Sequence, residues 1–76
     1  MKTSVGTQHR GTLAVLMRRN REKKGKTLDD MASRTRLARS TLWELENEYQ
    51  INPQLSTVKA ICKAYGFRIS RITDYD

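Results

Sequence analysis

The chain has few of the residues that build catalytic, metal-binding or disulfide-bonded sites. Its 76 residues include one cysteine, one histidine and one proline. A single cysteine excludes an internal disulfide and supplies no cysteine cluster for a metal. The sequence also lacks a Ser/His/Asp or Cys/His set, a phosphate-binding glycine loop and any metal-ligand spacing. We therefore expect a protein that is not an enzyme and that has no catalytic residue, metal or cofactor.

Long apolar runs are missing as well. No run approaches the ~18 residues of a membrane span, and no apolar segment typical of a secretory signal follows the N-terminus. The hydrophobic content of 37% is enough for one small helical domain. Such a thin core often gains stability from pairing with a second copy. We expect a cytoplasmic, nucleoid-associated protein without membrane contact.

Acidic residues are scarce in one half of the chain. The total is 15 Lys and Arg against 8 Asp and Glu, a net charge of +7. Residues 1–39 hold eleven basic and three acidic residues (net +8), whereas residues 40–76 hold four and five (net −1). A basic half is the electrostatic footprint of a nucleic-acid binder, although a solvated basic surface without a partner would have the same composition.

The most informative stretch runs from Thr27 to Asn47 and predicts two short helices joined by a tight turn. Thr27 with Asp30 three positions later is the pattern of a capping box, which satisfies free N–H groups at a helix start. Apolar residues share one face of the first helix (Leu28, Met31, Ala32) and of the second (Leu42, Leu45), and Leu37 lies in the turn. This arrangement is typical of a helix-turn-helix unit, whose second helix enters the DNA major groove.

The outward face of the second helix supplies the predicted base contacts, which are Arg39, Ser40, Trp43 and Glu44. An arginine can bind guanine O6 and N7 together, and a glutamate can accept from cytosine N4. Trp43 could pack on thymine methyl groups or belong to a protein contact, and the sequence leaves both open. The residues that flank the helix are predicted phosphate contacts, which set register without reading sequence: Thr27, Arg34, Arg36 and Asn47.

The remaining segments complete a helical domain. Residues 1–11 are predicted to form a flexible arm, and residues 12–76 the domain. A first helix is expected over residues 12–24, capped by Thr12 and ended by Gly25. A fourth helix is expected to open near Pro53, to end at Gly66, and to bury Leu55, Val58, Ile61, Cys62 and Tyr65, with the Tyr65 hydroxyl at the edge. Residues 67–76 fit either a short fifth helix or a short strand.

Three segments together resemble the lambda-repressor/Cro-like, or Xre-family, helix-turn-helix regulators. They are LMRRNREKKGKTLDDMA, LARSTLWELEN and NPQLSTVKAICKAYGF, and they lie between residues 16 and 67. The resemblance implies a compact all-α domain of four or five helices with its helix-turn-helix core at residues 27–47. It also implies double-stranded DNA as the partner and a homodimer that binds an inverted repeat.

The same resemblance implies an ion pair between Arg21 and Glu46 that ties the first helix to the third. The sequence departs from the family at the turn, where Arg36 replaces the usual Gly and Ala38 replaces a capping Ser or Thr. Glu48 stands where relatives carry Gly to close the recognition helix. We expect Asn47 to adopt the left-handed conformation there instead.

These observations predict a sequence-specific transcriptional regulator, in the role of a repressor, from a bacterium or a phage. It would read the major groove with the helix at residues 39–47. The alternative is an antitoxin-like component that binds a toxin protein and represses its own promoter. An RNA binder is less favoured, because RNA recognition usually stacks bases on aromatic residues and only Trp43 and Tyr49 are suited to it.

Overall fold

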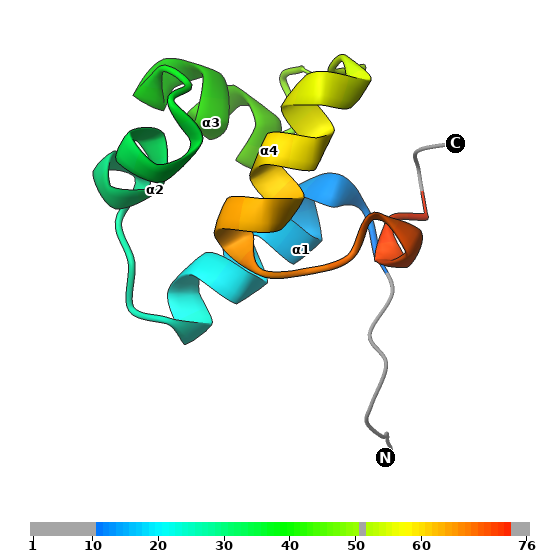
Figure 1. The fold of residues 1–76 in the computed structure, drawn as a ribbon, viewed down its shortest axis with the longest axis horizontal. Helices are drawn as coiled ribbons and strands as arrows, with labels where there is room; N and C mark the ends of the chain where they lie inside the picture. Colours follow the sequence, from blue (N-terminus) through cyan, green and yellow to red (C-terminus); the bar gives the residue numbers. More distant parts are fainter. Residues whose placement is uncertain (1–10, 51, 74–76) are drawn as a thin grey trace.

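The computed structural model describes residues 11–50 and 52–73 of the chain. These residues contain four α-helices and one 3-10 helix (Figure 1). The elements are α1 (Leu13–Lys23), α2 (Leu28–Thr35), α3 (Arg39–Glu46), α4 (Leu55–Tyr65) and the 3-10 helix η1 (Ile69–Arg71). No strand occurs in these residues apart from an isolated bridge between Gly11 and Ile72. The predicted all-α fold with a helix-turn-helix is confirmed.

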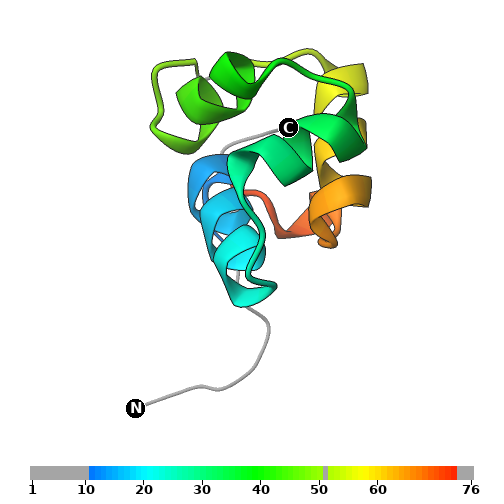
Figure 2. The same ribbon diagram turned by 90° about the vertical axis from the view of Figure 1, so that its left-hand side faces the viewer.

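The helices pack in a crossed arrangement around one core. α3 contacts both α1 and α2, and α4 also contacts both α1 and α2. Figure 2 shows α2 crossing the molecule, with α3 and the following loop above the start of α1. None of the helices in the described residues is long and apolar enough to cross a bilayer.

Local sequence signals fix the first two helix starts as expected. The Thr12 hydroxyl accepts a hydrogen bond from the Val15 N–H at 3.2 Å. Thr27 and Asp30 form a complete capping box, with bonds of 3.1 Å to the Thr27 hydroxyl and 2.9 Å to the Asp30 carboxylate. Gly25 has φ 66°, the left-handed conformation that ends α1.

The core confirms most of the predicted apolar faces. Its buried members are Leu13, Leu16, Met17, Met31, Leu42, Leu45, Val58, Ile61, Cys62, Tyr65, Phe67 and Ile72. Leu28, Ala32 and Leu37 are partly buried against them. Burial raises the pKa of the Cys62 thiol, which is consistent with a packing role for this side chain.

Three predictions for α4 are wrong. The helix begins at Leu55 after Gln54 as N-cap, so Pro53 precedes the helix and does not open it. Leu55 is 47% exposed, because it occupies the first position of the helix and not its packed middle. The Tyr65 hydroxyl does not lie at the edge of the core. The residue is fully buried, and its hydroxyl donates to Glu46 Oε2 at 3.0 Å.

The described part of the C-terminal segment, residues 67–73, forms neither a fifth α-helix nor a strand. It contains the single turn η1, and Ile72 bridges back to Gly11 in parallel. Gly11 donates to the Arg71 carbonyl at 3.1 Å and accepts from the Thr73 N–H at 2.9 Å. Phe67 and Ile72 thereby close the core, and Ile69 is exposed. The rest of the predicted arm, residues 1–10, lies outside the described residues.

Candidate nucleic-acid interface

The turn between α2 and α3 sets the angle of the two helices. Arg36 has φ 63° and ψ 23°, so it adopts the left-handed conformation that favours glycine. Its N–H donates to the Ala32 carbonyl at 2.8 Å. The Thr35 hydroxyl donates to the Met31 carbonyl at 2.8 Å and accepts from the Leu37 N–H at 3.2 Å. These bonds hold the turn although it lacks glycine.

The role of Thr35 in the turn was not predicted from the sequence. The Thr35 side chain is buried, and its three hydrogen bonds, to Met31, Ala32 and Leu37, are all local. A threonine at the end of a helix can bond back to the preceding turn, which is the signal that was available. Ala38 at the start of α3 provides no side-chain cap, as its residue type predicts.

The predicted base-contact residues lie on the outer side of α3. The Arg39 side chain is 60% exposed and Trp43 is 43% exposed. Ser40 is exposed as well, whereas Glu44 is half-buried. Arg39 Nε lies 3.2 Å from Asp29 Oδ1, in an ion pair whose two side chains are both largely exposed. Such a pair contributes little to stability, but it orients the guanidinium.

Trp43 also has a partner from outside the helix. Its ring stacks on that of Tyr49, with centroids 5.2 Å apart and planes within 14° of parallel. Tyr49 is 75% exposed. The two rings therefore form an aromatic pair on the surface, and the sequence had not indicated that they meet.

The end of α3 corrects the expectation for Asn47. Its φ is −106°, and the left-handed residue is Glu48, with φ 62°. Glu48 thus adopts the left-handed conformation that favours glycine. Asn47 instead uses its side chain: Nδ2 donates to the Trp43 carbonyl and Oδ1 accepts from Arg18 Nη2, both at 2.9 Å. These two bonds hold the Asn47 side chain in place, and the residue does not adopt the left-handed conformation that asparagine tolerates.

The predicted phosphate contacts differ in how free their side chains are. Arg34 and Arg36 are exposed. The Thr27 hydroxyl accepts a hydrogen bond from the Asp30 N–H. Hydrogen bonds from the Thr27 backbone N–H and the Thr27 side chain lower the pKa of Asp30. Asn47 is half-buried, and both of its polar side-chain atoms already have protein partners.

A buried carboxylate anchors α3 from behind. Glu46 accepts from Arg21 Nε at 2.8 Å and from Arg21 Nη2 at 2.9 Å, and Tyr65 adds a third bond. The Glu46 side chain is 1% exposed and that of Arg21 is 16% exposed. This is the bidentate pair that the resemblance implied. The hydrogen bond to Glu46 raises the pKa of Arg21, while burial and the nearby Glu46 charge raise the pKa of Tyr65.

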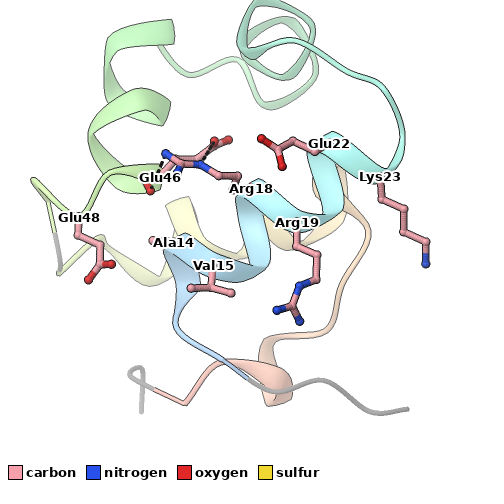
Figure 3. Close-up of a pocket in the computed structure, with 8 residues that line it drawn as sticks. All are labelled: Ala14, Val15, Arg18, Arg19, Glu22, Lys23, Glu46 and Glu48. Carbon is pink, nitrogen blue, oxygen red and sulfur yellow. Dashed lines mark hydrogen bonds and ion pairs between the residues drawn. The ribbon is translucent and has the colours of Figure 1, made fainter. Parts of the chain in front are cut away.

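A hollow of about 550 Å³ lies beside α1, away from the predicted base contacts (Figure 3). Its lining consists of Ala14, Val15, Arg18, Arg19, Glu22, Lys23, Glu46 and Glu48. Figure 3 shows Arg18 reaching toward Glu46 while Arg19 and Lys23 extend away from it. Charges of both signs line this hollow, and none of the predicted DNA-contact residues does. Across residues 11–50 and 52–73, no cluster of His, Cys, Asp or Glu is suited to a metal ion.

The fold and the exposed outer side of α3 define a helix-turn-helix domain of the DNA-binding class. The profile of the family described as "Helix-turn-helix domain" matches residues 12–71, and the chain belongs to this family. No curated protein matches the chain.

Proposed function

We propose that the protein is a sequence-specific transcriptional regulator of the Xre type that reads the major groove with α3. The observation that carries the proposal is the exposed outer side of α3, on which Arg39 projects from a helix anchored by Glu46. A reading helix must present polar side chains to base edges while its other side stays fixed in the core. α3 combines these two properties.

Arg39 is the residue to which we assign the strongest base contact. Its Nε is engaged by Asp29, which leaves the two Nη groups to face guanine O6 and N7. Ser40 and Glu44 would contact neighbouring bases. Thr27, Arg34, Arg36 and the remaining N–H of Asn47 would hold phosphates and set the register of α3.

A homodimer on an inverted repeat is the proposed binding form. One domain of this size covers few base pairs, so two copies on half-sites about one helical turn apart would be needed for specificity. A cytoplasmic protein of this kind acts as a repressor when its site overlaps a promoter. The antitoxin-like alternative uses the same helices on DNA and adds a toxin as a protein partner.

Selection from a pool of random duplex DNA at two salt concentrations tests the proposal. We expect an enriched inverted repeat that is still bound at the higher salt. Arg39→Ala should then relax one base position in each half-site, at a cost of ~1–3 kcal/mol per contact. Arg19→Ala is the matched control, because it removes an exposed charge of α1 and should leave the preferred sequence unchanged.

A second possible outcome would contradict the proposal. Binding without an enriched sequence, and lost as salt rises, would mean that only the net positive charge engages DNA. That result would refute sequence reading by α3. A chain that co-purifies from the source cell and binds without DNA would then favour the protein-partner alternative.

A further inference from the structure

The stacked pair of Trp43 and Tyr49 points to a specificity device at the end of the reading helix. We propose that Trp43 contacts the 5-methyl group of thymine in the major groove, and that Tyr49 is a positioning residue that fixes the indole for this contact. This inference rests on the proposed function of α3 as the DNA-reading helix.

The backbone after α3 places Tyr49 over Trp43. The Tyr49 N–H donates to the Glu44 carbonyl at 2.8 Å, and the Glu48 N–H lies 3.4 Å from the Leu45 carbonyl. With Glu48 in the left-handed conformation, this is the pattern of a Schellman motif, which reverses the chain direction. In a Schellman motif, the residue that follows the left-handed residue packs its side chain against the last turns of the helix. Here that residue is Tyr49, which packs on Trp43.

The motif explains where Tyr49 lies, but a helix end does not require two large exposed rings. Trp43 as a whole residue remains 43% exposed with its ring stacked on Tyr49, which leaves part of its surface open to a ligand. The Asn47 N–H and Nδ2 both donate to the Trp43 carbonyl, at 3.0 Å and 2.9 Å. The backbone and the ring of Trp43 are thus both restrained before any ligand binds, which reduces the entropy lost on binding.

Thymine is the base that suits this side chain. The indole carries one N–H donor and no acceptor, so it cannot make the paired bonds that identify guanine or adenine. The thymine methyl is the apolar group that the major groove presents. Arg39 lies one helical turn earlier on the same side of α3, and its neighbour Ser40 is also exposed and polar. These polar neighbours suit a hydrated groove better than an apolar protein contact.

The test replaces thymine by deoxyuridine, which removes only the methyl group, at each thymine of the selected site. We expect the wild-type affinity to fall about fourfold for each contacted methyl group, because burying one such group contributes ~0.8 kcal/mol. Trp43→Ala should bind the thymine and deoxyuridine duplexes equally. Tyr49→Ala should lose most of the discrimination, and Tyr49→Phe, which keeps the ring, should retain it.

A second readout follows the indole directly, since Trp43 is the one tryptophan of the chain. In the free protein, acrylamide should quench the fluorescence of Tyr49→Ala more strongly than that of the wild type or Tyr49→Phe. Quenching that is equal in all three proteins would refute the positioning role.

Three other outcomes would overturn the inference. Equal wild-type binding to thymine and deoxyuridine duplexes of an enriched site would refute the methyl contact while leaving the proposed function intact. If Tyr49→Ala weakens both duplexes by the same factor, Tyr49 acts only as part of the helix end. If Tyr49→Ala converts a dimer to a monomer in sedimentation and keeps the discrimination, the rings join two copies of the chain. Failure to enrich any sequence would count against the proposed function itself.

Discussion

Replacing Glu46 by glutamine should remove a large part of the stability of this domain. The carboxylate accepts three hydrogen bonds, with Arg21 Nε and the Tyr65 hydroxyl on Oε2 and Arg21 Nη2 on Oε1. A glutamine oxygen can replace only one of the two carboxylate oxygens. If it takes the place of Oε2, the amide nitrogen faces Arg21 Nη2, and two donors meet where one bond existed.

The expected loss can be estimated from these contacts. Glu46→Gln removes a charge-assisted bond, worth ~1.5–3 kcal/mol, and leaves the Arg21 charge without its counterion. Loss of one partner of a buried pair typically costs ~3–5 kcal/mol. The Arg21 side chain keeps 16% of its exposure and some hydration, so we expect a value near ~3 kcal/mol. For a domain of this size the midpoint of thermal unfolding should fall by roughly 12–24 °C.

Urea unfolding, followed by far-UV circular dichroism, measures this loss. The midpoint should fall while the dependence on urea concentration is unchanged. Glu48→Gln is the matched control, because Glu48 is exposed and its neutralisation should change the free energy of unfolding by less than about 0.5 kcal/mol. If Glu46→Gln does not fold, Tyr65→Phe removes one donor alone and should cost ~1 kcal/mol. A loss below ~1 kcal/mol in Glu46→Gln would refute the view that the pair is desolvated and anchors α3.

Three further predictions concern the helix-turn-helix unit. Ala38→Ser supplies the missing cap of α3 and should raise the free energy of unfolding by ~0.5–1 kcal/mol in urea titrations; no gain would mean that the cap is already satisfied. Arg36→Gly relieves the left-handed conformation and should stabilise by ~1 kcal/mol, while the slope of log affinity against log salt falls by about 1 if Arg36 holds a phosphate. The pKa of Asp30 is below its ordinary 3.8, so the unfolded chain binds more protons and stability should fall as pH drops below that value. Asp30→Asn should show a shallower fall over the same acid range, and an unchanged pH profile would contradict this origin.

Apart from the Arg21–Glu46 pair, which the family resemblance implied, the correctly predicted parts of the fold depend on neighbours within one helical turn. The caps at Thr12 and Thr27, and the glycine at the end of α1, are recognisable because their partners lie three or four positions away. The apolar faces of α1, α2 and α3 are likewise repeats of three and four residues. Each signal was complete within the segment that it describes.

Two of the incorrect predictions, for Tyr65 and Asn47, concern contacts that no local pattern contains. The Tyr65 hydroxyl meets Glu46 across 19 positions of sequence, so periodicity could place the ring in the core but could not identify a buried acceptor. Asn47 was expected to take the left-handed turn because of its intrinsic preference. Its side chain is instead bound by Arg18 of α1, 29 positions away, and Glu48 takes the turn.

The candidate site likewise contains features that a local pattern predicts and contacts that it does not. Its exposed residues could be proposed from the helix-turn-helix pattern, because the inward positions of α3 define the outward ones. The partners of these residues could not, since Asp29 approaches Arg39 from α2 and Tyr49 approaches Trp43 from the loop. Both contacts depend on the angle between segments, which the turn at Arg36 and the reversal at Glu48 determine.

The anchoring of α3 is unequal at its two ends, and this inequality bears on how the helix would read DNA. Its last turn is fixed by Glu46 to α1 and α4, and by Asn47 to Arg18. Its first turn has no side-chain cap, and Arg39 in that turn forms only an exposed ion pair, with Asp29. The Arg39 side chain can therefore adjust to a base edge at little cost in free energy, whereas the last turn of α3 holds the helix in place. Substitutions at Glu46 should consequently lower stability and affinity together, and substitutions at Arg39 should lower affinity alone.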